Sequence, residues 1–99
     1  MSRSAEWNAL RHQILDKAVV RGNVILSSGR EADYYIDLRR VTLDAQAAPL
    51  VGAVMRQINS SFDYRAVGGL TLGADPVAAA MMHNAAGDGE LLNSFVVRK

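Results

Sequence analysis

Residues 65–80 read RAVGGLTLGADPVAAA, and this stretch decides the fold. Arg65–Gly68 predicts a short buried strand, and the glycines that follow predict a tight turn. Asp75 and Pro76 are a typical helix start, because a capping residue is followed by a first-turn proline. The apolar residues after them predict a helix to about Ala86. A buried strand that turns directly into a helix indicates an α/β protein.

The flanking segments extend this unit in both directions. A helix is predicted over Asp44–Asn59, with Asp44 as its cap. Pro49 is tolerated only in the first turn, so the regular helix should begin near Gln46 or later. Ser94–Arg98 predicts a last, β-branched strand. Helix, strand, helix and strand in this order predict a parallel sheet with helices packed on it. The carboxyl ends of its strands, where α/β proteins bind ligands, then share one edge.

The N-terminal part predicts a helix and then a hairpin. Ser4–Val20 carries apolar residues at helical spacing, with Ser2 or Ser4 as its cap and Gly22 as its end. Two extended pieces around a turn signal then predict an antiparallel pair. These pieces are Asn23–Ser27 and Asp33–Leu38.

The composition predicts one soluble domain with one modest core. The chain has 99 residues, of which 49% are hydrophobic and 21% charged. A net charge of +1 gives no basis for general nucleic-acid or membrane binding, so any anion site must be local. The chain has no cysteine, which excludes disulfides and thiolate metal sites and fits a cytoplasmic protein. It shows neither a signal peptide nor a bilayer-spanning stretch.

Two features at the predicted ligand edge favour an anion. The turn Gly68–Gly73 feeds a helix N-terminus, whose free N–H groups and dipole attract phosphate. Arg98 and Lys99 follow the last strand and suit phosphate oxygens. Asp75, beside the turn, would repel a phosphate placed there. The plainer alternatives are a strand-to-helix turn without a ligand and a solvated cationic tail.

Other chemistry is weakly supported. In the segment 26–40, Tyr34 and Tyr35 lie near a glycine turn and suit a planar ligand, although both can be ordinary strand residues. His12 and His83 lie on separate predicted helices without partners at a metal-ligand spacing. No serine has the context of a nucleophile. The residues therefore predict no metal site and no acyl-transfer centre.

Three stretches together resemble the bacterial orotate phosphoribosyltransferases. They are LSSGREADYYIDLRRVTL (26–43), VGGLTLGADPVA (67–78) and FVVRK (95–99), in this order and at these separations. The resemblance runs from about Val24 to Lys99. It implies a phosphoribosyltransferase-like α/β fold, a parallel sheet flanked by helices with an N-terminal helix and β-hairpin as a hood. Residues 1–99 would be the N-terminal part of a single domain, with the hood over 1–43 and the first half of the α/β core over 44–99.

The resemblance also implies an activity. The family transfers ribose 5-phosphate from phosphoribosyl diphosphate (PRPP) to orotate, giving orotidine 5′-phosphate and pyrophosphate in de novo pyrimidine biosynthesis. Mg²⁺ is the implied cofactor, and a cytoplasmic homodimer with shared active sites is the implied assembly. Neither a nucleic acid nor a membrane is an implied partner.

The family pattern assigns binding residues but no catalytic residue with confidence. The hood would hold orotate, and the glycine loop would cradle pyrophosphate through a cis peptide at Leu70–Thr71. The orotate-binding residues would be Ser27, Tyr35 and Ile36. The PRPP-binding residues would be Thr71, Leu72, Gly73, Arg98 and Lys99.

The sequence departs from the family pattern in two ways. Ser27 stands where many relatives carry lysine, so the charge would have to come from Arg30 or Arg39; Thr71-Leu72 stands where relatives commonly carry a Tyr-Lys pair. In addition, the family's acidic pair and 5′-phosphate loop are not in this chain. We therefore expect these residues alone to be inactive, and to aggregate or need a partner through an open sheet edge. A phosphoribosyltransferase for another base and a non-catalytic α/β interaction module are the alternatives.

Overall fold

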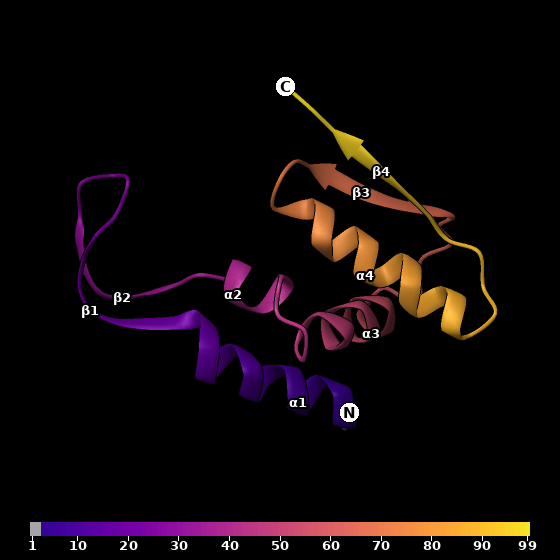
Figure 1. Cartoon of the computed structure of the whole chain (residues 1–99), viewed down its shortest axis with the longest axis horizontal. Coiled ribbons are helices and arrows are strands. Elements are labelled where there is room, and N and C mark those ends of the chain that lie inside the picture. Colours follow the sequence, from indigo (N-terminus) through magenta and orange to yellow (C-terminus); the bar gives the residue numbers. More distant parts are fainter. Residues whose placement is uncertain (1–2) are drawn as a thin grey trace.

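The structure is a computed structural model that describes residues 3–99. Figure 1 shows a hairpin projecting from a helical layer, with a small sheet at the other end of the molecule. In chain order the elements are α1 (Ala5–Gln13), a π-helical turn η1 (Ile14–Ala18), β1 (Val19–Ile25), β2 (Glu31–Ile36), α2 (Arg39–Thr42), α3 (Ala48–Ile58), β3 (Ala66–Leu70), α4 (Ala74–Gly87) and β4 (Asn93–Val97).

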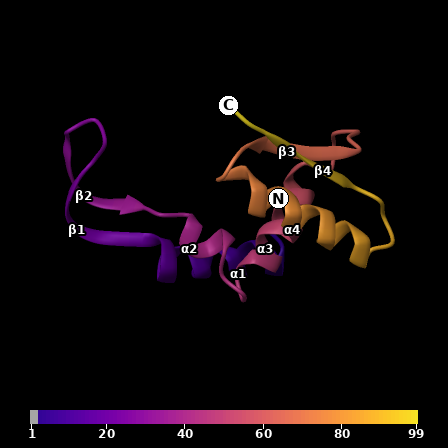
Figure 2. The ribbon, with the colours of Figure 1, turned by 45° about the horizontal axis from the view of Figure 1, so that its top comes forward.

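The second half forms the predicted α/β unit. Strands β3 and β4 pair in parallel, with Ala66 opposite Asn93 and Leu70 opposite Val97. Helix α4 lies under this pair, and α3 packs against α4 (Figures 1 and 2). The predicted order of helix, strand, helix and strand is therefore confirmed, and the carboxyl ends of both strands lie at one edge.

The first helix is shorter than its apolar spacing predicts. Ser4 caps α1 by accepting a hydrogen bond from the Trp7 N–H at 3.0 Å, while Ser2 lies outside the described residues. The helical segment ends at Ala18, because the β-branched Val19 and Val20 pair with β2 instead. The predicted helix end at Gly22 is also wrong. This glycine lies inside β1 with a φ of +122°, where the register of the hairpin shifts.

Two small clusters of buried apolar side chains hold the elements together. One joins η1, α2 and α3 through Ala18, Val41, Ala47 and Val51. The other joins α4 to the start of β4 through Met81, Ala85 and Leu92. The outer parts of the sheet remain uncovered, since Leu70 is 52% and Phe95 49% exposed. Within residues 3–99, no helix is both long and apolar enough to span a membrane.

Asp44 organises the entry to α3. Its Oδ2 accepts hydrogen bonds from the N–H groups of Gln46 and Ala47, at 3.0 and 2.8 Å, and from Lys17 Nζ at 2.9 Å. The helix itself begins at Ala48, with Pro49 in its first turn as the sequence predicts. The hydrogen bond from Lys17, followed by that from the Ala47 amide, holds the pKa of Asp44 below its ordinary value.

We expect Asp44→Asn to lower the stability of the chain at neutral pH but not in strong acid. A carboxyl with a depressed pKa contributes stability above its ordinary value of 3.8, and this contribution is lost as the pH falls through the lowered pKa. Denaturant unfolding between pH 7 and pH 2 should therefore show a gap between wild type and variant that closes at the acid end. Asp63→Asn, at an exposed position, is the control and should show no such gap. A stability difference between wild type and Asp44→Asn that is the same at every pH would contradict a role for the ionised Asp44 carboxylate.

Candidate functional site

The loop after β3 and the cations after β4 lie at the same edge of the sheet. The Thr71 N–H donates to the Val97 carbonyl oxygen at 2.9 Å, which carries the β3–β4 ladder one step beyond the last paired residues. Arg98 follows Val97 directly, so Thr71 and Arg98 are neighbours across the two strand ends. The structure thus brings together the two features that the sequence predicted to form an anion site.

The non-proline cis peptide falls one residue later than the family pattern predicted. It joins Thr71 to Leu72, not Leu70 to Thr71. Leu70 is still part of β3, opposite Val97, and the Thr71 N–H still bonds to β4. The chain therefore leaves the strand only after Thr71, and the turn occupies residues 71–73.

The loop presents amide groups that have no backbone partner. Among the described residues, the N–H groups of Leu72, Gly73 and Ala74 donate to no backbone carbonyl. The Leu72 side chain is 81% exposed, and Gly73 is also exposed, so this part of the loop faces solvent. Free N–H groups at the start of a helix form a favourable environment for an anion.

Asp75, which the sequence suggested would repel a phosphate at the turn, bonds to the turn itself. Its Oδ2 accepts a hydrogen bond from the Thr71 hydroxyl, and its own N–H donates to the Leu72 carbonyl oxygen at 3.1 Å. Its Oδ1 is buried without a hydrogen-bond partner among the described residues. The carboxylate is therefore directed toward Thr71 and the interior of the loop.

The two glycines in β3 serve close packing. A Cβ atom on Gly68 would lie 2.3 Å from the Phe95 carbonyl oxygen and 2.6 Å from the Phe95 ring. One on Gly69 would lie 2.8 Å from the Cβ of Ala74. These positions therefore let β4 and the start of α4 approach β3, while the free amides belong to the residues that follow.

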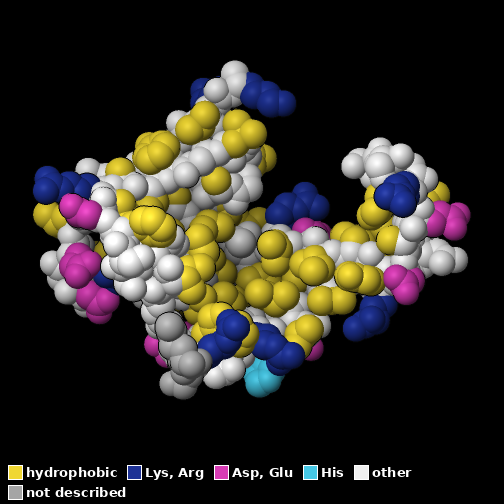
Figure 3. Space-filling model, turned by 180° about the vertical axis from the view of Figure 1, so that it is seen from behind, with side chains coloured by type: hydrophobic (Ala, Val, Ile, Leu, Met, Phe, Trp, Pro, Cys, Tyr) yellow, Lys and Arg dark blue, Asp and Glu magenta, His cyan; other side chains and the backbone are white. Residues whose placement is uncertain are grey.

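The hairpin places the predicted orotate-binding residues at two different ends. Tyr35 and Ile36 lie at its base, opposite Val20 and Val19. Ser27 lies in the exposed turn at the tip, in the segment between β1 and β2. The structure thus does not bring Ser27 together with the other two. Figure 3 shows the surface hollowed between this hairpin and the β3–β4 end of the molecule.

A charged cluster follows Ile36 at the base of the hairpin. The Asp37 side chain, 15% exposed, accepts from Arg39 Nε at 3.1 Å, and Arg40 Nε lies 3.6 Å from its other oxygen. The hydrogen bond from the Arg39 side chain holds the pKa of Asp37 below its ordinary value. Two guanidinium groups thus share one carboxylate, which leaves a local positive charge. Arg40 was not singled out from the sequence, because nothing in the local pattern marks its pairing.

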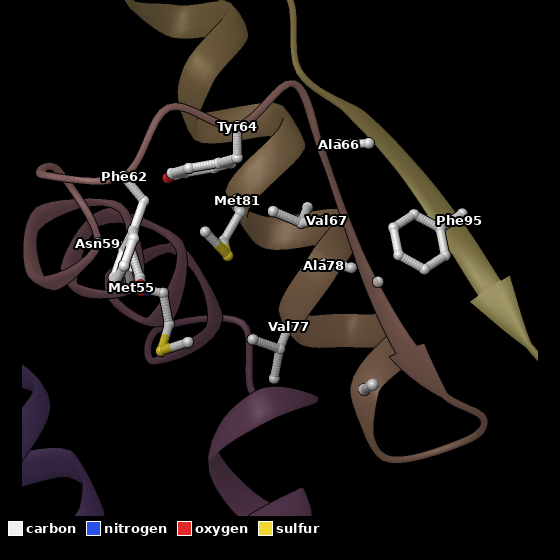
Figure 4. Close-up of a pocket in the computed structure, with 12 residues that line it drawn as sticks. Met55, Asn59, Phe62, Tyr64, Ala66, Val67, Val77, Ala78, Met81 and Phe95 are labelled. Atoms are coloured by element: carbon white, nitrogen blue, oxygen red, sulfur yellow. Dashed lines mark hydrogen bonds between the residues drawn. The ribbon is translucent and has the colours of Figure 1, made fainter.

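A cavity of about 600 Å³ is lined by residues of α3, β3, α4 and β4 and of the segment between α3 and β3. Figure 4 shows the side chains of Met55, Tyr64, Val67 and Met81 gathered between α3, β3 and α4, with Phe95 beyond the strand. No charged side chain lines it. It is therefore uncovered apolar packing surface and does not suit a phosphate. In residues 3–99, no group of three or more histidine or acidic side chains could hold a metal ion.

Comparison with known proteins connects this geometry to one family. No protein-family model matches the chain. A curated relative from Streptomyces avermitilis, named orotate phosphoribosyltransferase, is 66% identical over 91 residues, which cover 92% of this chain and 50% of the relative. One of the same name from Corynebacterium glutamicum is 58% identical over 99 residues, covering 99% of this chain and 52% of the relative. The chain spans about half the length of the curated relatives that it matches.

Solved structures agree with this match. The Mycobacterium tuberculosis orotate phosphoribosyltransferase in complex with inorganic phosphate superposes with a TM-score of 0.87 at 51% identity, covering 97% of this chain and 55% of that one. The same enzyme in complex with PRPP gives a TM-score of 0.83 at 50% identity, covering 95% and 54%. The predicted phosphoribosyltransferase-like fold is confirmed. Over the length that it spans, this chain is similar to orotate phosphoribosyltransferases in both sequence and fold.

Proposed function

We propose that this chain is part of an enzyme that transfers ribose 5-phosphate from PRPP to orotate, giving orotidine 5′-phosphate and pyrophosphate in pyrimidine biosynthesis. The observation that carries the proposal is the Thr71–Val97 hydrogen bond, which sets the loop amides beside the terminal cations. The names of the relatives and the M. tuberculosis complex with PRPP support the choice of substrates.

The loop and the cations would bind the diphosphate of PRPP. Free amides of Leu72 and Gly73 suit its oxygens, and Thr71 holds this loop against β4. Arg98 would grip the diphosphate as a fork and Lys99 as a point charge. As the bond from ribose to pyrophosphate breaks, negative charge grows on the leaving group, and these fixed positive groups would stabilise it. No covalent nucleophile is needed, so we assign no catalytic residue in this chain.

The hairpin base would bind orotate. The backbone at Tyr35 and Ile36 is the proposed contact, and Ser27 at the tip would approach only from the far end of the hairpin. Orotate carries a carboxylate, which needs a cation. Of the two candidate arginines, Arg39 is the better placed, because it pairs with Asp37, the residue directly after Ile36. Arg30 lies in the exposed turn.

Mg²⁺ is the proposed cofactor of the whole enzyme. The residues described in this structure form no acidic or histidine cluster, so they do not fit a protein-bound Mg²⁺ site. Phosphate oxygens commonly supply ligands to Mg²⁺, and PRPP would bring them. We assign this chain no step through the ion. We further propose a cytoplasmic homodimer, and one domain in which residues 1–43 form the hood and 44–99 the first half of the core.

A chimera tests the proposed function. This chain replaces the matched segment of the S. avermitilis relative, and the product is assayed for pyrophosphate release from PRPP with orotate, uracil or adenine. Of the three bases, we expect the chimera to use only orotate. We expect no activity from this chain when it is not joined to the rest of the relative. Preference for uracil or adenine would indicate a phosphoribosyltransferase for another base. A folded chimera that neither binds nor turns over PRPP would favour the interaction module.

A further inference from the structure

An acidic side chain in the first turn of α4, that of Asp75, bonds to the loop that follows β3, although the proposed role of this loop as an anion cradle does not require it. We propose that Asp75 is a positioning residue, and that its bond to Thr71 forms a latch that holds the loop in its diphosphate-binding shape. The loop latch is defined here as the side chains of Thr71 and Asp75. This inference rests on the proposed function, because it deepens the role of the same loop.

Three hydrogen bonds close the loop around its free amides. The Thr71 N–H donates to Val97 and its hydroxyl donates to Asp75, so Thr71 is held from both sides. The Asp75 N–H donates to the Leu72 carbonyl oxygen. These bonds use none of the N–H groups of Leu72, Gly73 and Ala74, which therefore remain available to an anion. A loop fixed in this way loses little conformational entropy when an anion binds.

The position of Asp75 allows two effects of opposite sign on anion binding. A carboxylate in the first turn of a helix repels a nearby anion, so its removal should strengthen binding. A carboxylate that shapes the loop improves binding, so its removal should weaken it. The structure favours the second effect. One carboxylate oxygen receives the Thr71 hydroxyl and the other is buried, so the carboxylate serves the structure of the loop and its entry into α4.

The test is an NMR titration of the chimera in which this chain replaces the matched segment of the S. avermitilis relative. The chimera is titrated with inorganic diphosphate and followed at the amide signals of the loop, and the unsubstituted chimera is the wild type of this comparison. We expect Asp75→Ala and Thr71→Val to weaken binding by about tenfold, a typical effect of one lost charge-assisted hydrogen bond. Thr71→Ser keeps the hydroxyl and should stay within about twofold of wild type. Asp63→Ala removes the same charge at an exposed position outside the loop and should bind no more weakly than wild type.

The outcomes separate this inference from the proposed function. If wild type binds no diphosphate at the loop, the proposed function fails and the latch fails with it. If wild type binds and Asp75→Ala binds equally or more tightly, the latch alone is refuted. Thr71→Ser keeps the hydroxyl, whereas Thr71→Val keeps only the shape of the side chain. Binding that serine preserves and valine weakens therefore shows that the hydroxyl is needed, and not only the volume of the side chain. If Thr71→Val does not fold, the comparison of Asp75→Ala with Asp63→Ala still shows whether removal of the Asp75 carboxylate weakens or strengthens diphosphate binding.

Discussion

Gly52→Ala is expected to unfold this chain or to destabilise it by about 3 kcal/mol or more, the range of severe overpacking. Helices α3 and α4 meet at this position. A Cβ atom on Gly52 would lie 2.3 Å from the carbonyl oxygen of Ala80 and 2.6 Å from its carbonyl carbon. Both atoms belong to the backbone of α4, so no side-chain rotation relieves the clash. The two helices would have to move apart. Because α4 packs on the sheet, this would also separate α3 from the α4–sheet unit.

The measurement is chemical denaturation followed by far-UV circular dichroism. Gly87→Ala is the matched control, since Gly87 also lies in a helix and, apart from its chain neighbours and the nearby backbone of that helix, nothing lies within 4 Å of the Cβ atom it would gain. Alanine is favoured over glycine in helices by about 0.5–1 kcal/mol, so this control should be neutral or slightly stabilising. A Gly52→Ala variant as stable as wild type would mean that α3 and α4 are less tightly packed than described.

The α/β half could be predicted because several local signals agree there. Pro76 marks the first turn of α4, although this helix begins at Ala74 with Gly73 as its N-cap and not at Asp75. The turn before it ends the short strand β3, which was predicted to be buried but whose residues are exposed or half-buried. The parallel direction of the two strands then places Thr71 and Arg98 at one edge without any further information. The structure confirms this placement through the Thr71–Val97 bond.

The features that the sequence did not predict depend on contacts between residues that are distant in sequence, or on backbone geometry that residue types do not specify. Apolar spacing alone continued the first helix to Val20, but pairing with Tyr35 makes this residue part of a strand. Gly68 looked like part of a ligand loop, whereas the Phe95 ring explains its missing side chain. The pairing of Thr71 with Asp75 follows from the course of the turn, which residue types do not specify.

Arg98→Ala, made in the chimera with the S. avermitilis relative, is expected to lower kcat/KM for PRPP by about 100-fold or more, the usual scale for a charged group that stabilises a leaving group. Arg98 follows Val97, whose carbonyl oxygen is bonded to the loop at Thr71. A guanidinium at this position would contact pyrophosphate as negative charge develops on it. Initial-rate kinetics with varied PRPP measure the effect.

The division of the loss between kcat and KM identifies what Arg98 does. A contact that is equally strong before and during bond cleavage raises KM alone, whereas one that strengthens with the leaving-group charge lowers kcat. We expect the fall mainly in kcat. Arg65→Ala removes the same charge just before β3, at the opposite end of the strand, and should leave the kinetics near wild type. Equal losses in the two variants would indicate that overall charge matters and that Arg98 has no specific place at the diphosphate.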